Sequence, residues 1–381
     1  MIGVVGGGQL AQMLVQAANQ RSIPINVQTS SKSDPAAKIA NEVILSDPNN
    51  LDGTKTLAKK TKAITFENEW VDIEGLSRIK DQGVSFFPDV QALAPLVDKL
   101  SQRELLQSLD IPSPEWIPIL TTDFSSFKLP SGWKFPLMAK TARGGYDGKG
   151  TRIIRDSKDF EQLFSLDNSH RWFLEKWVEY EKELSLVVSR DENGIIRFFP
   201  IAETSQMNQV CDWVIAPAEV SHPVEVMAQN IAASLMSELN YVGVMAIEFF
   251  YGAEGLIVNE IAPRTHNSGH FSIEACNSSQ FDQQLCITAG LPVPSPSLIA
   301  PGALMVNLLG LPKTTDLTIK ERLDSILSLG GIELHWYEKE HEAPGRKLGH
   351  VTFLLTKEDS TSRRLEAFDV IKQIREIWPM S

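Results

Sequence analysis

The stretch VGVMAIEFFYGAEGLIVNEIAPR, residues 242–264, places two glutamates inside apolar runs that are typical of the two β-strands of a hairpin. A five-residue turn from Gly252 to Leu256 would bring Glu248 directly opposite Glu260 on one face, whereas a four-residue turn would put them on opposite faces. Charged side chains rarely enter such runs unless they are paired or bound to a metal. The pattern therefore predicts a functional hairpin.

If the two carboxylates share a face, they lie about 5 Å apart and repel each other. A Mg²⁺ ion that also binds substrate phosphates would relieve this repulsion, and Asn259 offers a neutral oxygen beside them. Two glutamates in solvent at a sheet edge are the alternative. The apolar residues that flank Glu248 and Glu260 favour the metal site.

The 381-residue chain is longer than one hydrophobic core usually serves, so two or three domains are expected. Its composition, with 43% apolar and 22% charged residues, is typical of a soluble globular protein. The net charge of −12 argues against nucleic acid as a partner, because a phosphate backbone would be repelled. Three cysteines without a CxxC pair fit a reducing compartment and disfavour a zinc site. With no signal-peptide pattern and no membrane-spanning apolar run, a cytoplasmic protein that binds no membrane is expected.

Residues 2–29 have the pattern of strand, glycine turn, helix and strand, and residues 63–70 and 84–89 are further candidate strands with helical stretches between them. This alternation predicts a parallel α/β sheet that ends near residues 95–99. A proline-rich bridge, residues 291–297, precedes a small C-terminal part. The expected domains are residues 1–98, residues 99–290 with a lid around 120–185, and residues 291–381.

The turn Gly6-x-Gly8-x-x-Ala11 matches the dinucleotide-binding fingerprint, in which backbone N–H groups at a helix N-terminus hold an anion. An NAD site also needs an acidic residue at the end of the second strand, and residues 27–31 (VQTSS) contain none. A dehydrogenase is therefore disfavoured. A monophosphate or another small anion, with Gln9 as an added donor, and a tight turn without a ligand both remain open.

KTARGGYDGKG, residues 140–150, is a glycine-rich segment with a lysine at each end that lacks the Walker A pattern. Its glycines let backbone amides approach an anion, but a solvated flexible loop has the same composition. The strand-like runs on both sides, residues 135–140 and 150–155, predict a hairpin whose tip could close over phosphates. A second hairpin is expected around Asn193-Gly194, and a helix over 224–239.

Two further segments concentrate hydrogen-bond donors. APRTHNSGH (residues 262–270) holds an arginine, two histidines, an asparagine and a serine, which suit an anion better than zinc because no matching Cys/His set exists. A capped helix start is the structural alternative. HWYEKEHEAPGRKLGH (residues 335–350) has basic residues around a Pro-Gly turn, which either are simply solvated or hold a substrate phosphate.

Taken together, the motifs occur in a characteristic order: GGGQL (6–10), KTARGGYDGKG (140–150), EKWVEYEKELS (175–185), MAIEFF (245–250), VNEIAPRTHNSGH (258–270) and HWYEKE…PGRKLGH (335–350). This order resembles the 5-(carboxyamino)imidazole ribonucleotide synthases, ATP-grasp ligases of de novo purine biosynthesis, over residues 2–355. The resemblance implies an α/β and α+β fold, with a Rossmann-like preATP-grasp domain, an ATP-grasp region of two lobes and a small C-terminal domain.

The resemblance also implies the reaction, its cofactors and its partners. ATP phosphorylates bicarbonate to carboxyphosphate, and the amine of 5-aminoimidazole ribonucleotide captures the carboxyl group, which releases ADP and phosphate. ATP and two Mg²⁺ ions are the implied cofactors, and a homodimer is the implied assembly.

The resemblance assigns roles to individual residues. ATP is expected at Lys99, Lys140, Gly145, Tyr146, Asp147, Gly148, Lys149, Gly150, Thr151, Glu175, Lys176, Trp177, Val178, Glu183, Asn259 and Glu260, with the adenine at 175–178 and the ribose at Glu183. Mg²⁺ is expected at Glu248 and Glu260. The catalytic residues are expected to be Arg264, which stabilises carboxyphosphate, and His266 and Tyr146, which position the amine together with Asn267. The ribonucleotide is expected at Gly8, Gln9, Leu10, Glu67, Asn267, Ser268, Lys339, Arg346 and Lys347.

Three alternatives remain at this level. Another ATP-grasp ligase that makes an acyl phosphate, such as formate-dependent glycinamide ribonucleotide transformylase, would share most of these motifs. A non-catalytic nucleotide-binding regulator would be expected to lack Glu248, Glu260 or Arg264, and all three are present. A dehydrogenase is disfavoured by the missing acid on the second strand.

Overall fold

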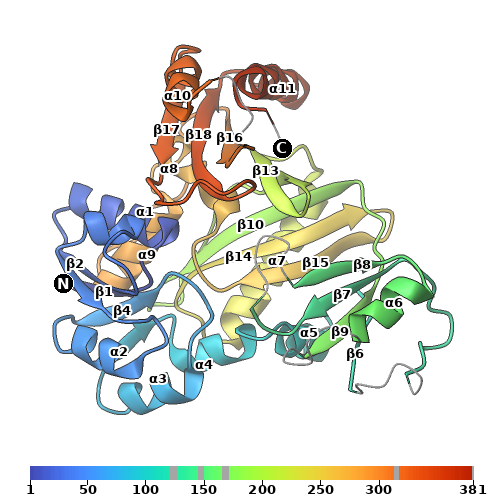
Figure 1. Ribbon diagram of the computed structural model, residues 1–381, viewed down its shortest axis with the longest axis horizontal. Coiled ribbons are helices and arrows are strands. Elements are labelled where there is room, and N and C mark those ends of the chain that lie inside the picture. Colours follow the sequence, from blue (N-terminus) through green and yellow to red (C-terminus); the bar gives the residue numbers. More distant parts are fainter. Residues whose placement is uncertain (121–126, 145–149, 165–170, 313–316, 380–381) are drawn as a thin grey trace.

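The computed structural model describes residues 1–120, 127–144, 150–164, 171–312 and 317–379. Figure 1 shows an N-terminal α/β part in blue, a small sheet in green, and a long central sheet whose far end carries the C-terminal strands in orange and red. In the described residues no helix is both long and apolar enough to cross a membrane.

The N-terminal part is a five-stranded parallel sheet in the order β3-β2-β1-β4-β5, as the alternating pattern predicts. Its strands are β1 (Ile2–Val5), β2 (Ile25–Thr29), β3 (Glu42–Leu45), β4 (Ala63–Phe66) and β5 (Ser85–Phe87). Its helices are α1 (Gln9–Gln20), α2 (Leu51–Ala58), α3 (Ile73–Lys80) and α4 (Val90–Leu93), with short 3₁₀ turns at Pro35–Lys38 and Ala94–Leu96. One face packs on α1 and on the later helix α9 (Gln280–Ala289), and the other face packs on α2 and α3. The carboxyl ends of β1 and β4 consequently face the centre of the protein (Figure 1).

A second, four-stranded antiparallel sheet has the order β6-β9-β7-β8. Its elements are β6 (Trp116–Pro118), β7 (Leu137–Thr141), β8 (Thr151–Ile154), α6 (Ser157–Phe164) and β9 (Trp172–Lys176). The antiparallel pairing of β7 with β8 confirms the hairpin predicted around the glycine-rich segment. The helix α5 (Lys99–Ser108) connects this sheet to the N-terminal part.

The central sheet has nine strands and runs β15-β14-β10-β12-β13-β16-β18-β17, with β11 paired to β10. Its strands are β10 (Lys182–Arg190), β11 (Ile196–Phe198), β12 (Ala202–Met207), β13 (Val210–Ala216), β14 (Gly243–Gly252), β15 (Gly255–Ala262), β16 (Gly302–Leu309), β17 (Ile332–Trp336) and β18 (Lys347–Leu355). The other helices are α7 (His222–Glu238), α8 (Ser272–Ala275), α10 (Ile319–Leu327) and α11 (Ser360–Ile377), with a 3₁₀ turn at Asn267–Gly269. The hairpin at Asn193-Gly194 and the helix near 224–239 are confirmed. The C-terminal strands extend the central sheet and do not form a sheet of their own.

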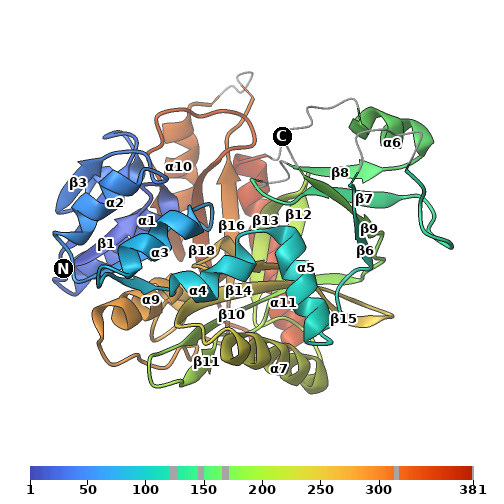
Figure 2. The ribbon, with the colours of Figure 1, turned by 90° about the horizontal axis from the view of Figure 1, so that it is seen from below.

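The helix α7 covers one face of β10, β14 and β15 (Figure 2). The residues that pack on it alternate along each strand, for example Leu184 and Leu186 on β10 and Ile247 and Phe249 on β14. Because successive side chains of a strand point to opposite faces, Glu248 lies on the face away from α7.

The turn of the carboxylate hairpin is shorter than both the five-residue and the four-residue turn that the sequence left open. Gly252 pairs directly with Gly255, so the turn has only two residues, Ala253 and Glu254. The register then shifts between Glu248 and Phe249, and Glu248 still pairs with Glu260. A β-bulge leaves Asn259 without a partner residue on β14. The bulge therefore places Glu248 and Glu260 on one face of the sheet, as a five-residue turn would have done.

A row of imidazoles joins the C-terminal strands to the centre of the protein. The ring of His350 stacks on that of His335 at 4.5 Å and lies 4.8 Å from that of His270. The Tyr337 hydroxyl contacts His350 Nδ1 at 2.8 Å, and Glu274 Oε1 lies 2.6 Å from His335 Nε2. Burial, followed by the neighbouring imidazoles, lowers the pKa of His350 well below its usual value, and burial lowers that of His270 likewise.

We expect the stability of the protein to fall at acidic pH through His350. An imidazole whose pKa is lowered by folding contributes fully above about pH 6.5 and loses its contribution as the pH falls, because the unfolded chain takes up a proton that the folded chain excludes. Relative to His350→Gln, the wild type should therefore lose up to about 1.4 kcal/mol of unfolding free energy per pH unit below 6.5. Urea titrations of both proteins at pH 7.5 and 5.5 measure this difference. Parallel pH profiles would contradict a neutral, buried His350.

Candidate active site

The site is built on a row of side chains that crosses three strands. Ser185 on β10 pairs with Glu248 on β14, which pairs with Glu260 on β15. Directly opposite residues project from the same face of a sheet, about 5 Å apart. The side chains of Glu248 and Glu260 keep 24% and 33% of their exposure, so a ligand can reach both carboxylates.

The two carboxylates have different electrostatic surroundings. Burial, together with the charges of Glu260 and Glu183, raises the pKa of Glu248 to about 7. Burial also opposes ionisation of Glu260, but Lys99 and Lys140 outweigh it and lower the pKa of Glu260 to about 2. Lys99 Nζ lies 2.9 Å from Glu260 Oε2. Among the described residues Glu248 forms no ion pair with a lysine or arginine, unlike Glu260, and a bound cation would supply that positive charge.

These residues fit Mg²⁺ held jointly with a nucleotide. The described residues contain no group of three or more His, Cys, Asp or Glu side chains able to hold a metal by themselves. Mg²⁺ in phosphate-transfer sites is commonly bound by one or two carboxylates, with substrate phosphates and water as the other ligands. The side-chain oxygen of Asn259 accepts a hydrogen bond from Lys140 Nζ at 3.1 Å, so Asn259 orients a lysine in this state.

A buried cluster of charged side chains, Arg103, Lys140 and Glu175, lies beside Glu248 and Glu260. Lys140 and Glu175 were predicted site residues, and Arg103 was not. Glu175 lies between Lys140, whose Nζ is 2.8 Å from Oε2, and Arg103, whose Nε is 2.6 Å from Oε1. Burial would raise the pKa of Glu175, but the charges of Arg103 and Lys140 lower it. Residues 175–178 were expected to line the adenine, and this stays a prediction. The carboxylate of Glu175 itself is used in these two ion pairs. Arg103 was not identified from the sequence, since one arginine on an amphipathic helix looks like an ordinary surface residue.

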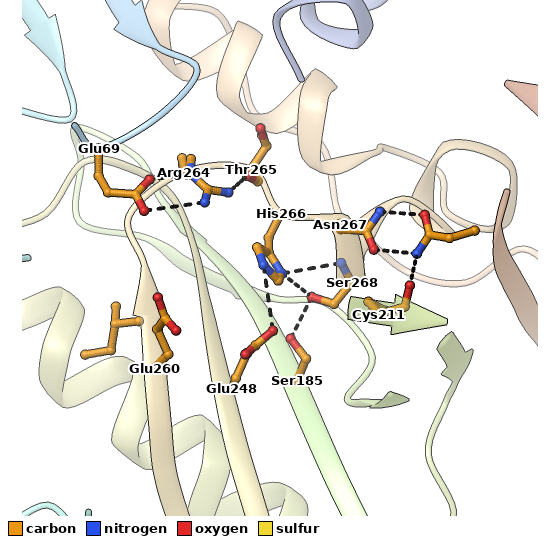
Figure 3. Close-up of polar contacts among 12 residues, drawn as sticks. Glu69, Ser185, Cys211, Glu248, Glu260, Arg264, Thr265, His266, Asn267 and Ser268 are labelled. Atoms are coloured by element: carbon orange, nitrogen blue, oxygen red, sulfur yellow. Dashed lines mark hydrogen bonds and ion pairs between the residues drawn. The ribbon is translucent and has the colours of Figure 1, made fainter. Parts of the chain in front are cut away.

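Arg264 is held by a residue of the N-terminal part. Its Nε lies 2.6 Å from Glu69 Oε2, and Nη2 lies 3.5 Å from Oε1 (Figure 3). Nη1 donates to the carbonyl of Thr265 at 3.1 Å. Glu69 was missed from the sequence, although its place just after the carboxyl end of β4 is where parallel α/β sheets present polar side chains.

His266 faces the carboxylate pair through one ring edge and is anchored through the other. Its Nε2 lies 3.7 Å from Glu248 Oε1, and its Nδ1 lies 2.9 Å from Ser268 Oγ (Figure 3). Ser268 Oγ in turn lies 2.7 Å from Ser185 Oγ, the third member of the strand row. Ser268 therefore orients the imidazole over the row, and its expected contact with the ribonucleotide stays a prediction.

The side chain of Asn267 does not face the site. Its amide exchanges two hydrogen bonds with that of Asn307 on β16, at 3.0 and 2.8 Å, and Asn307 also donates to the carbonyl of Cys211 at 2.9 Å (Figure 3). Both amides are buried. The expected role of Asn267 in positioning the amine stays a prediction. In this structure its side chain ties residues 262–270 to the C-terminal strands.

The backbone N–H groups of the glycine turn in the N-terminal part bind a side-chain carboxyl group of the protein itself. The N–H groups of Gly8 and Leu10 donate to the carboxylate of Glu67 at 2.6 and 3.2 Å. A Cβ atom at Gly8 would collide with this carboxylate, which explains the glycine. The binding of a substrate phosphate by these amides stays a prediction, and in this structure their partner is Glu67, which was expected to contact the substrate ribose.

The basic C-terminal turn reaches the same region. Lys339 Nζ donates to the carbonyl of Lys347 at 2.6 Å and lies over the ring of Tyr337, which packs in the core of the N-terminal part. Lys347 is buried, and its charge lowers the pKa of Glu248. The burial of Glu248 itself has the larger effect and raises that pKa. Arg346 is exposed and donates to the carbonyl of His341 at 2.8 Å.

The expected adenine and ribose contacts lie between the small sheet and the central sheet. Residues 175–178 span the end of β9 and the connection to β10, and the Trp177 side chain is exposed. Lys176 Nζ is 2.5 Å from Glu115, and Glu183 Oε1 accepts from the Tyr180 hydroxyl at 2.5 Å. Thr151 is the first residue of β8, and Gly150 directly precedes it. The expected contacts Gly145, Tyr146, Asp147, Gly148 and Lys149 lie outside the described residues.

Known protein families match all three parts of the chain. Residues 1–96 match the ribonucleotide synthetase preATP-grasp domain, residues 104–281 the ATP-grasp domain, and residues 303–364 the phosphoribosylaminoimidazole carboxylase C-terminal domain. The N5-carboxyaminoimidazole ribonucleotide synthase of Synechococcus elongatus is 42% identical over 378 residues, which cover 99% of this chain and 95% of that protein.

Two solved structures share the whole fold. The Aspergillus clavatus carboxyaminoimidazole ribonucleotide synthase complexed with ATP has a TM-score of 0.89 at 30% identity and covers 98% of each chain. The enzyme from the same organism in complex with ADP and 5-aminoimidazole ribonucleotide has a TM-score of 0.87 at 28% identity, again over 98% of each chain.

Proposed function

The chain belongs to the family of N5-carboxyaminoimidazole ribonucleotide synthases, which are ATP-grasp ligases, and from this premise we propose the reaction of its site. It carboxylates 5-aminoimidazole ribonucleotide in an ATP-dependent step of purine biosynthesis. Bicarbonate is the carboxyl donor, and carboxyphosphate is the intermediate. The observation that carries this proposal is the carboxylate pair of Glu248 and Glu260 beside Arg264 and His266 on one face of the central sheet.

ATP is bound between the small sheet and the central sheet. Lys140 and Lys99 contact its phosphates, and residues 175–178 and Glu183 contact the adenine and the ribose. Glu248 and Glu260 would hold Mg²⁺, with two ions in the complete site, and the metal would supply positive charge against the phosphates of ATP. The ion pairs of Lys99 with Glu260 and of Lys140 with Glu175 keep both lysines in place for the phosphates.

The reaction proceeds in two displacements. An oxygen of bicarbonate attacks the γ-phosphorus of ATP, the bond to the β-phosphate oxygen breaks, and ADP leaves. The amine nitrogen then attacks the carboxyl carbon of carboxyphosphate, inorganic phosphate leaves with the former bicarbonate oxygen, and the amine loses a proton. Arg264, fixed by Glu69, stabilises the carboxyphosphate anion, and excluding water prevents its hydrolysis.

The ribonucleotide is bound where the three parts of the chain meet. Its amine is positioned by His266 and Tyr146, and its phosphate by Gln9, Lys339, Arg346 and Lys347. The Glu67 side chain accepts a hydrogen bond from the N–H of Gly8, which is next to Gln9 in the glycine turn. This position supports a contact of Glu67 with the ribose hydroxyls. The division at residues 98 and 290, a homodimeric assembly and a cytoplasmic location remain predictions. Three buried cysteines without a disulfide support the last of these.

ADP release in the presence of bicarbonate should require 5-aminoimidazole ribonucleotide. A coupled assay with all substrates should give continuous ADP formation, and omission of the ribonucleotide or of bicarbonate should reduce it to background. The matched control replaces the pair with glycinamide ribonucleotide and formate. Equal ADP formation with that pair would assign the chain to the formate-dependent alternative and overturn the proposal.

A further inference from the structure

The outer edge of β15 is covered by helix α5. β15 is the last strand of the central sheet on this side, and an edge strand normally presents unpaired N–H and C=O groups. Here two consecutive buried side chains of α5, Gln102 and Arg103, bind those groups directly. The segment they bind contains Asn259 and Glu260, the bulge and the expected metal ligand.

Gln102 binds the residue that follows Glu260. Its Nε2 donates to the carbonyl of Ile261 at 2.9 Å, and its Oε1 accepts from the N–H of Ile261 at 3.1 Å. The same Nε2 donates to the carbonyl of Leu96 at 2.8 Å. The side-chain amide thus acts as a short substitute for a neighbouring strand.

Arg103 binds the residues that precede Glu260. Its Nη2 donates to the carbonyl of Asn259 at 2.6 Å and its Nη1 to that of Val258 at 3.3 Å. The remaining Nε is paired with Glu175, and the side chain is only 3% exposed. All of these contacts depend on the planar fork of the guanidinium, which spans three acceptors at fixed angles.

The bulge decides where Glu260 points. Below the bulge Phe249 pairs with Val258, and without it the next pair would be Glu248 with Asn259. Glu260 would then sit opposite Ile247, which packs on the α7 face of the sheet. A slip of one residue reverses the face of every following side chain.

We propose that Gln102 and Arg103 are positioning residues that hold the bulge of β15 and so keep Glu260 beside Glu248 for Mg²⁺ binding. This inference rests on the proposed metal role of the two glutamates. The clamp is formed by Gln102 and Arg103, and it acts through backbone carbonyl and N–H groups without contact to the metal or the substrates. Loss of the clamp should weaken the enhancement of nucleotide binding by Mg²⁺ more than it weakens nucleotide binding without Mg²⁺.

The variant Arg103→Lys tests the clamp. Lysine keeps a cation for Glu175 but has one nitrogen, which cannot span both carbonyls of the bulge. Calorimetric titrations with ADP, with and without Mg²⁺, should show that the Mg²⁺ concentration for half-maximal enhancement of ADP binding rises about tenfold, the usual effect of losing a residue that orients metal ligands. ADP affinity without Mg²⁺ should stay within about twofold.

Arg363→Lys is the matched control. Arg363 is also buried and its Nη1 donates to two backbone carbonyls, those of Lys357 and Glu358, at 3.4 and 2.8 Å, but it lies in the C-terminal part. It should lower the melting temperature as Arg103→Lys does and leave the Mg²⁺ response within about twofold of the wild type. An Mg²⁺ response in Arg103→Lys equal to that of Arg363→Lys would overturn the clamp.

Gln102→Met provides a second test in case Arg103→Lys does not fold. It removes both bonds to Ile261 with little change in volume, and it should raise the required Mg²⁺ concentration at least about threefold. An unchanged requirement overturns the proposal. If ADP binding by the wild type does not respond to Mg²⁺, the metal assignment fails and the clamp with it. A responsive wild type with unaffected variants refutes the clamp alone.

Discussion

Replacing Glu260 by glutamine is expected to lower turnover roughly a thousandfold while leaving the fold intact. Glutamine has the shape of glutamate, so the bulge and the pairing with Glu248 are retained. What is lost is one of the two negative charges that would hold Mg²⁺ and the partner of Lys99 at 2.9 Å. Steady-state rates over a range of Mg²⁺ concentrations, together with circular dichroism, measure both parts of this expectation.

The same hairpin offers a matched control for this variant. Glu254 lies in the two-residue turn and is exposed, so Glu254→Gln makes the identical chemical change far from the row of Ser185, Glu248 and Glu260. It should retain wild-type turnover. Wild-type turnover in Glu260→Gln would remove Glu260 from the metal site.

Replacing Arg264 by methionine is expected to lower kcat about 100- to 1,000-fold, because a charge that would stabilise the carboxyphosphate anion is removed. Binding of Mg²⁺ and ADP should be unchanged, since the guanidinium is paired with Glu69 and not with the glutamate row. The variant should also lose stability, because Glu69 is left as a nearly buried charge without its partner.

The stability effect and the catalytic effect can be separated. Adding Glu69→Gln to Arg264→Met removes the unpaired charge, so stability should recover while kcat stays low. Arg375→Met is a matched control, because Arg375 on α11 pairs with Asp212 on β13 and is similarly buried, at 15% exposure against 16% for Arg264. It should lose stability and keep its kcat. Recovery of kcat in the double variant would refute a direct role of Arg264.

Local patterns predicted the elements of this fold well. Alternation of apolar runs and glycines located β1, α1 and the two hairpins, because these depend on neighbours in the sequence. The continuity of the C-terminal strands with the central sheet was not predicted, since the pairing of β13 with β16 joins residues about 90 positions apart. The strand β3 was also missed, and its four residues are all partly or fully exposed.

The candidate site was predictable where residue chemistry is unusual. Glu248 and Glu260 stand out because they interrupt apolar strands. The sequence left open whether they share a face, and the structure pairs them directly. Whether such a pair shares a face depends on whether the turn and any bulge together contain an odd or an even number of residues. The bulge at Asn259 has no clear signature in the sequence. Glu69, Arg103 and Asn307 were missed for a different reason: each becomes informative only through a partner more than 35 residues away.

The origin of the phosphate oxygen tests the proposed chemistry most directly. The enzyme would be incubated with ATP, Mg²⁺, 5-aminoimidazole ribonucleotide and ¹⁸O-labelled bicarbonate, and the inorganic phosphate analysed by mass spectrometry. Attack of bicarbonate on ATP transfers one of its oxygens to phosphorus, so the released phosphate should carry one ¹⁸O atom. Unlabelled phosphate would show that water attacked ATP, and would contradict carboxyphosphate as the intermediate.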